Sequence, residues 1–129
     1  MNKELTLNVL EERSSICKMD NNSPIPMWVL KNRNFYSITK TSDELSIISL
    51  EKLVPEDVKQ EKGWRALKID GNLDFSLVGI VSSITGILAE MEISVFVMST
   101  YNTDYIFIKE ENMSRALETL REYYKMEKV

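Results

Sequence analysis

Cys17 is the only cysteine in the sequence, and the sequence contains no histidine. A cysteine nucleophile needs a neighbour that converts its thiol to a thiolate, and histidine is the usual base. A lone cysteine also forms no internal disulfide, which fits a reducing compartment. We therefore expect Cys17 to be structural and the chain to be cytoplasmic.

The remaining side chains give little support to an enzyme. Without histidine, catalytic triads and the commonest zinc sites lose their usual member. The sequence has no GxxxxGK[ST] phosphate loop, and its carboxylates do not stand out from ordinary surface charge. Carboxylate-only catalysis and magnesium binding stay open in principle. The prediction is a protein with no catalytic residues, no cofactor and no metal.

Composition limits the class of partner. The net charge is −4, whereas binding to nucleic acid or to an anionic membrane rests on clustered Lys and Arg. The longest apolar runs, Val95–Met98 and Tyr105–Ile108, are too short to cross a bilayer, and the first residues contain no apolar signal region. A hydrophobic content of 43% is enough for a packed core. We expect a soluble domain, or two small ones, without nucleic-acid or membrane partners.

The second half of the sequence predicts the order strand, helix, strand, strand, helix. Trp64–Asp70 has strand character, and apolar residues at helical spacing follow from about Ser76. Ser94–Thr100 and Tyr105–Ile108 are rich in β-branched and aromatic residues and flank a polar turn, as in a hairpin. A final helix is expected after Asn112, which is a suitable N-cap.

The first half is harder to interpret. Its alternating apolar residues predict strands at Glu4–Leu10, Arg13–Met19, Phe35–Thr41 and Leu45–Leu50, the last two forming a hairpin. Met27–Leu30 fits a helical turn or a short strand, and Pro55–Lys62 fits a linker or a short helix. Both alternatives stay open.

The two hairpins suggest an internal repeat. SITKTSDELSII, from Ser37, and VMSTYNTDYIFI, from Val97, both place a short polar turn with an acidic residue between two apolar strands. The offset between them is constant, about 60 residues, which indicates duplication of one structural unit. We expect a first unit at residues 1–62 and a second at residues 63–129.

The most specific segment, ISVFVMSTYNTDYIFIKEENMSRAL from Ile93, resembles a known family. It is similar to the ACT domains of the CASTOR-type cytosolic arginine sensors and of short prokaryotic relatives. The resemblance extends over the whole chain and is stronger in the second half. It implies an α+β ferredoxin-like (βαββαβ) ACT fold in tandem duplication, with strand exchange between the repeats allowed by the topology. It also implies a regulatory module that binds a free amino acid.

In that family the ligand lies between the start of the first helix and the following hairpin. The positions that match in this sequence, together with their neighbours, are Asp74, Phe75, Leu77, Gly79, Ile80, Thr103 and Asp104. The first turn of a helix has unpaired N–H groups that suit the carboxylate of an amino acid. Asp104 suits its ammonium group, and Ile80 and Leu77 suit its aliphatic part.

Three of these residues also have a purely structural explanation. Asp104 in a hairpin turn is more often a turn former than a ligand contact, close helix–strand packing explains Gly79 equally well, and Ile80 is a core residue first. The sequence departs from the arginine sensors because it has two ACT-like units in place of four and because Leu77 replaces their acidic residue. We therefore expect a homodimer and a generic amino acid or one smaller than arginine as ligand. A regulated protein partner is a further expectation. The alternative is an assembly scaffold without a ligand.

Overall fold

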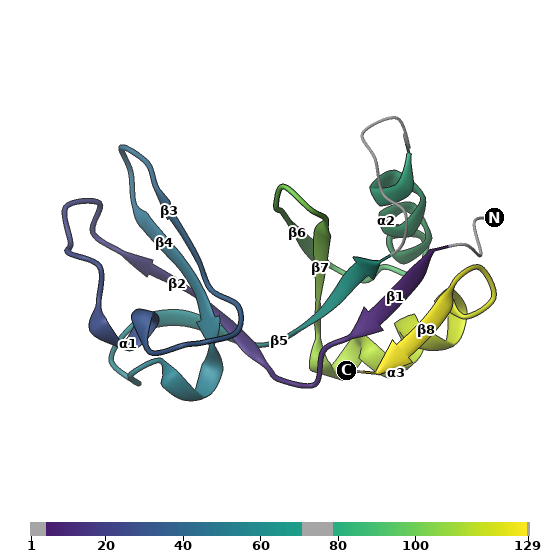
Figure 1. Cartoon of the computed structure of the whole chain (residues 1–129), viewed down its shortest axis with the longest axis horizontal. Helices are drawn as coiled ribbons and strands as arrows, with labels where there is room; N and C mark the ends of the chain where they lie inside the picture. The colour runs from purple at the N-terminus through teal and green to yellow at the C-terminus, as the bar shows by residue number, and fades with distance from the viewer. Residues whose placement is uncertain (1–4, 71–78, 129) are drawn as a thin grey trace. The chain divides into compact units, whose positions relative to one another are not determined.

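The computed structural model describes residues 5–70 and 79–128 (Figure 1). The predicted site residues Asp74, Phe75 and Leu77 lie outside the described residues. Contacts divide the chain into unit 1, which comprises Met1–Glu11 and Arg65–Val129, and unit 2, which comprises Glu12–Trp64. The predicted boundaries differ from this division because residues 1–11 group with the second half of the chain.

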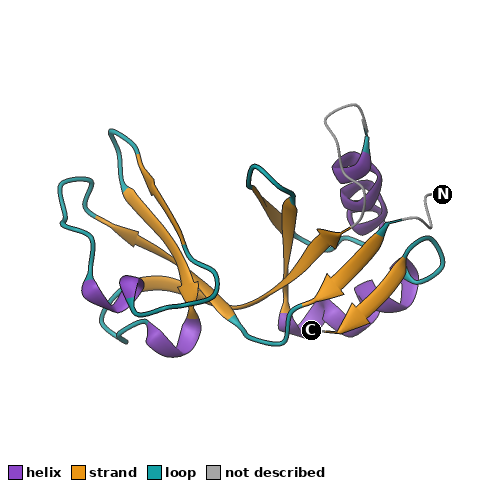
Figure 2. Ribbon diagram, viewed as in Figure 1, coloured by secondary structure: helices purple, strands orange, loops and turns teal. Residues whose placement is uncertain are grey.

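Unit 1 consists of a sheet with two helices (Figure 2). Its elements are, in chain order, β1 (Thr6–Val9), the end of β5 (Lys59–Asp70), α2 (Ile80–Glu90), β6 (Val95–Ser99), β7 (Asp104–Lys109), α3 (Glu110–Leu120) and β8 (Lys125–Lys128). The strand order is β6-β7-β5-β1-β8. From β5 onward the chain therefore follows the predicted βαββαβ order, and β1 is inserted between β5 and β8.

Alternating apolar residues place the core of unit 1 between its sheet and its helices. Leu5 precedes β1, the strands contribute Leu7, Val9, Leu67, Ile69, Ile106 and Ile108, and the helices contribute Ile84, Leu88, Met113, Ala116, Leu117 and Leu120. Burial of each large apolar side chain favours folding by about 1.5–3 kcal/mol. The second face of the sheet carries the stacked rings of Phe96 and Phe107, whose centroids are 4.5 Å apart.

Unit 2 has the same order of strands but shorter helices. Its elements are β2 (Ser14–Met19), α1 (Met27–Leu30), β3 (Ser37–Lys40), β4 (Leu45–Leu50), the 3-10 turn η1 (Glu51–Leu53) and the beginning of β5. The strand order is β3-β4-β2-β5, with antiparallel neighbours throughout. Its core is formed by Cys17, Val29, Leu45, Ile47 and Val54. The α+β class predicted from the sequence is confirmed.

Several element boundaries differ from the sequence predictions. Met27–Leu30 is helical, and the segment expected as a linker or a helix instead supplies the first residues of β5, which begins at Lys59. The last helix begins at Glu110 with Lys109 as its N-cap, so Asn112 is not the cap. A glycine with positive φ, Gly63, accompanies the bulge where β5 pairs with β2, and such a backbone conformation favours glycine.

Candidate small-molecule site

The turn between β6 and β7 is joined to the end of β5. β7 pairs with β5, and the Thr103 hydroxyl donates a hydrogen bond to the carbonyl oxygen of Ile69, near the end of β5. β5 is the strand that precedes α2. In Figure 1 the β6–β7 turn and the first turn of α2 lie at the same end of unit 1. The topology therefore places Thr103 and Asp104 at the end where α2 begins.

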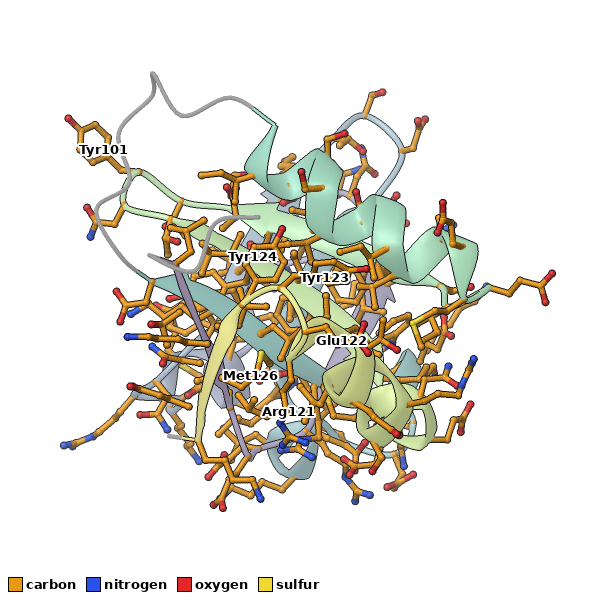
Figure 3. All side chains as sticks on the ribbon, turned by 90° about the vertical axis from the view of Figure 1, so that its right-hand side faces the viewer. Tyr101, Arg121, Glu122, Tyr123, Tyr124 and Met126 are labelled. Atoms are coloured by element: carbon orange, nitrogen blue, oxygen red, sulfur yellow. The ribbon has the colours of Figure 1, made fainter. Side chains whose placement is uncertain are left out.

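The turn itself is held by Thr100 and Thr103. The backbone N–H of Thr100 donates to the Thr103 carbonyl at 2.8 Å, and the backbone N–H of Thr103 donates to the Thr100 hydroxyl oxygen at 3.2 Å. Tyr101 lies at the tip with 88% of its surface exposed and projects away from the body of unit 1 (Figure 3). No side-chain bond from Asp104 to this turn is found among the residues that the structure describes.

Asp104 instead bonds across the hairpin. It lies directly opposite Ser99 in the β6–β7 register, and one of its carboxylate oxygens accepts a hydrogen bond from the Ser99 hydroxyl. A carboxylate can accept about four hydrogen bonds, so this one is fixed in orientation while acceptor capacity remains. The Thr100 hydroxyl thus bonds within the turn, and the Asp104 carboxylate bonds to Ser99 at its base.

Gly79 is the N-cap of α2 and has a left-handed backbone with φ +82°. Its carbonyl accepts the N–H of Ser83 at 2.8 Å, as the first bond of the helix. Among the described residues, no atom beyond the adjacent residues lies within 4 Å of the place where a Cβ would stand. The left-handed backbone explains a glycine at this position, whereas close packing against the described residues does not.

Of the predicted site residues, the structure describes Gly79, Ile80, Thr103 and Asp104. Ile80 is partly buried and packs against the core of unit 1. Ser99 and Thr100 were not among the predicted site residues, although both stand next to the predicted turn. Cross-strand register decides which side chain Asp104 meets, and register was not predicted.

A buried tyrosine links the two helical parts of unit 1. Tyr124 is 5% exposed and forms a hydrogen bond with Ser83 in the first part of α2. Burial raises the pKa of the Tyr124 phenol, and the bond with Ser83 partly opposes this effect. Tyr124 therefore packs in the core of unit 1 near the beginning of α2.

Cys17 has the surroundings of a structural residue. It is 2% exposed, and burial raises the pKa of its thiol, an effect partly opposed by a hydrogen bond with Ser15. Nucleophilic cysteines have a lowered pKa and an accessible thiolate. Within residues 5–70 and 79–128 no group of three or more acidic or cysteine side chains is arranged to hold a metal ion. No helix in that part of the chain is long and apolar enough to cross a membrane.

Comparison with protein families agrees with this geometry. The family model of the ACT domain matches residues 59–122, which contain β5, α2, β6, β7 and α3. Residues 59–122 are therefore similar in sequence to ACT domains. A second model, of an N-terminal domain family, matches residues 12–57 and so covers most of unit 2. The chain thus has an ACT-like α+β fold.

The chain is also similar to proteins of known name or structure. Over 101 residues the chain is 27% identical to human "Cytosolic arginine sensor for mTORC1 subunit 1"; the match covers 70% of this chain but 31% of the sensor. The chain therefore spans about a third of the length of that relative. A solved Agrobacterium tumefaciens protein is 29% identical, with a TM-score of 0.91 over 99% of this chain and 96% of that one.

A more distant structure shows the fold alone. Escherichia coli aspartokinase III, solved in complex with aspartate and ADP, has a TM-score of 0.59 at 11% identity. The match covers 88% of this chain and 31% of the aspartokinase. The ACT-like arrangement of this chain therefore also occurs as part of a larger enzyme.

Proposed function

We propose that this chain is a non-catalytic regulatory module that binds a free amino acid at the end of unit 1 where α2 begins. The observation that carries the proposal is the hydrogen bonding of the Asp104 carboxylate. Its carboxylate is oriented by Ser99 across the base of the turn and keeps acceptor capacity. Such a carboxylate suits an ammonium group, and a sheltered charge-assisted hydrogen bond is worth roughly 1.5–3 kcal/mol.

The start of α2 supplies the complementary charge. Its N-cap is glycine, so no N-cap side chain bonds to the N–H groups of the first turn. Those groups and the helix dipole suit the carboxylate of the ligand, and no described side chain crowds Gly79. Ile80 forms an apolar wall in this proposal, and Thr103 positions the turn through its bond to Ile69.

The proposed ligand site also includes three residues from the sequence between β5 and α2. We assign Asp74, Phe75 and Leu77 to it from the resemblance to ACT domains. The named relative is an arginine sensor, and aspartokinase III was solved with aspartate, so amino acids of different charge occur among the similar proteins. Because Leu77 is apolar, we propose a ligand smaller and less basic than arginine.

We further propose a tandem pair of ACT-like units that act as a cytoplasmic homodimer and pass the ligand signal to a protein partner. The equal strand order of unit 2 and of unit 1 without β1 supports the duplication. β6 and β8 form the edges of the unit 1 sheet, and exposed edges favour pairing with another chain. Light scattering with and without ligand tests the dimer and its rearrangement.

A thermal-shift screen against the twenty amino acids tests the proposed function. We expect one amino acid, or a small group, to raise the melting temperature at millimolar concentration, since a ligand that binds only the folded state stabilises it. The D-enantiomer of the best ligand serves as a control of equal charge. No stabilisation by any of the twenty would contradict the proposal.

An assembly scaffold is the second candidate, and the surface around α1 favours it. Met27 and Leu30 are 69% and 50% exposed, which is unusual for large apolar side chains side by side in a short helix. In a pure scaffold, Met27→Ser with Leu30→Ser would disrupt assembly, whereas Asp104→Asn would have no effect on any ligand or on assembly. Measuring oligomeric state and amino-acid binding of both variants separates the two candidates.

A further inference from the structure

Unit 1 contains a second hollow, which we call the α3 pocket. It has a volume of about 220 Å³ and is lined by residues of β1, β5, α3 and β8. Three of its lining residues, Arg65, Arg121 and Lys128, are cations. Ser114 adds a hydroxyl group to the lining. In Figure 3 Arg121 lies well away from Tyr101, which marks the β6–β7 turn. The α3 pocket is therefore distinct from the proposed amino-acid site.

Two cations of the α3 pocket, Arg65 and Lys128, lie on the same strand faces as apolar core residues. Along β5, Arg65 shares a face with Leu67 and Ile69, which are core residues. Along β8, Lys128 shares a face with Met126, which packs against the same core. Since side chains alternate between the two faces of a strand, both cations point to the helix-covered side of the sheet.

Helix α3 contributes the third cation in the same way. Arg121, just past the end of α3, follows Met113 and Leu117 at intervals of four residues. Residues four apart lie on the same face of a helix, so Arg121 continues the row that lines the α3 pocket. A cation at a helix C-terminus also interacts favourably with the helix dipole. That effect explains Arg121 alone and does not explain the convergence with Arg65 and Lys128.

The charge in the α3 pocket is only partly compensated. Arg65, whose side chain is 17% exposed, donates to the carbonyl of Leu10 at 3.2 Å and forms an ion pair with Glu110 at 3.3 Å. Neither Arg121 nor Lys128 has an ion-pair partner within residues 5–70 and 79–128. The pocket thus collects net positive charge in a chain whose overall charge is −4.

We propose that the α3 pocket binds a small molecule that carries a phosphate monoester. A guanidinium group offers a planar pair of donors that matches phosphate oxygens, an ammonium group adds a point charge, and a hydroxyl adds a further donor. Arg121, Lys128 and Ser114 supply these three kinds of group around one pocket. The volume fits a phosphate with a few carbon atoms and is below that of typical drug-sized pockets, at roughly 300 Å³ or more.

Titration of the full chain with glycerol 3-phosphate, followed by backbone-amide NMR, tests this proposal. We expect saturable shifts at Ser114, Arg121 and Lys128, with the turn at Tyr101 unaffected. Succinate at equal charge and sodium chloride at equal ionic strength are the reference titrations. Shifts that are equally large with succinate, or that sodium chloride reproduces, would overturn the phosphate assignment.

Matched variants locate the site. Arg121→Gln and Lys128→Gln should each weaken glycerol 3-phosphate binding by about five- to tenfold, which corresponds to roughly 1 kcal/mol. Arg115→Gln on α3 and Lys125→Gln on β8 remove the same charges outside the pocket and should leave the affinity unchanged. Equal weakening by all four variants would mean general electrostatic attraction and would overturn the proposal. Vesicles containing phosphatidic acid distinguish the source: binding of free glycerol 3-phosphate without vesicle binding supports the small molecule, and vesicle binding alone overturns it.

Discussion

The turn between β3 and β4 in unit 2 and the turn between β6 and β7 in unit 1 have nearly the same hydrogen bonds. In unit 2 the N–H of Thr41 donates to the carbonyl of Glu44 at 2.9 Å, and the N–H of Glu44 donates to the Thr41 hydroxyl at 3.1 Å. Thr100 and Thr103 make the equivalent bonds in unit 1. Both turns are therefore closed by a threonine hydroxyl.

The two turns differ at the residue that begins the returning strand. In unit 2 the pair that flanks the turn is Lys40 and Leu45, and Leu45 is 3% exposed within the core. In unit 1 the corresponding pair is Ser99 and Asp104, which bond to each other. The same backbone thus carries a core residue in one unit and an oriented carboxylate in the other.

The helices show a parallel difference. α2 has eleven residues and begins at Gly79, whereas α1 has four residues and begins after Pro26. A single helical turn has little dipole and no free first turn to offer an anion. Among the described residues, unit 1 therefore offers both halves of the amino-acid site that we propose, whereas Leu45 of unit 2 is used for packing.

The largest effect on stability is expected when the residue types at positions 45 and 104, which flank the two turns, are exchanged. Leu45→Asp places a carboxylate in a buried apolar site and is expected to destabilise the fold by about 4 kcal/mol. Asp104→Leu changes a partly exposed position and should alter stability by less than about 0.5 kcal/mol. Urea unfolding of the two variants measures both values. Equal destabilisation by the two variants would contradict the assignment of Leu45 to the core and of Asp104 to a partly exposed position.

Truncating one leucine side chain in each helix should give the next largest difference in stability. Leu88 in α2 is fully buried, so Leu88→Ala is expected to cost about 3 kcal/mol through lost burial and a cavity. Leu30 in α1 is 50% exposed, and Leu30→Ala should cost well under about 1 kcal/mol. Both values come from urea unfolding. A large cost for Leu30→Ala would mean that α1 is covered in solution.

Alanine substitution of Gly79, the N-cap of α2, and of Gly86, inside α2, should change stability in opposite directions. Gly79→Ala forces a left-handed backbone on alanine and is expected to destabilise by about 1 kcal/mol, although no atom obstructs the new methyl group. Gly86→Ala, inside the helix and also unobstructed, should stabilise by about 0.5–1 kcal/mol. Thermal unfolding of the two variants provides the test. Stabilisation by Gly79→Ala would contradict the assigned N-cap conformation.

Alkaline pH should weaken both units modestly. Burial raises the pKa of the Cys17 thiol in unit 2 and of the Tyr124 phenol in unit 1. For a group with a raised pKa in the folded state, the contribution to stability is full below its unfolded pKa and is lost as pH rises through the folded pKa. We expect the free energy of unfolding to fall above the ordinary pKa of a thiol. Cys17→Ala and Tyr124→Phe should each reduce that fall in urea titrations at neutral and alkaline pH.

Much of unit 1 could be predicted from the sequence because its patterns are regular. The apolar stripes of α2 and α3 and the β6–β7 hairpin followed from side-chain periodicity alone. β8 could not be predicted, because KMEK carries three charges and forms a strand only by pairing with β1. The insertion of β1 between β5 and β8 depends on the same long-range pairing.

The candidate site was only partly predictable for a similar reason. The residue types of Asp104 and Gly79 suggested a ligand site, but their structural roles depend on tertiary contacts. Register places Ser99 opposite Asp104, and the open space at Gly79 depends on what surrounds it in the fold. Short-range propensities contain neither kind of information.

Calorimetric titration of the best amino acid from the screen into three proteins tests the central claim most directly. The proteins are the wild type, Asp104→Asn and Asp43→Asn, the last of which makes the same chemical change in the exposed turn of unit 2. We predict at least a tenfold loss of affinity for Asp104→Asn, which corresponds to about 1.4 kcal/mol, and none for Asp43→Asn. Equal affinity of Asp104→Asn and the wild type would contradict the assignment of the Asp104 carboxylate to the ligand.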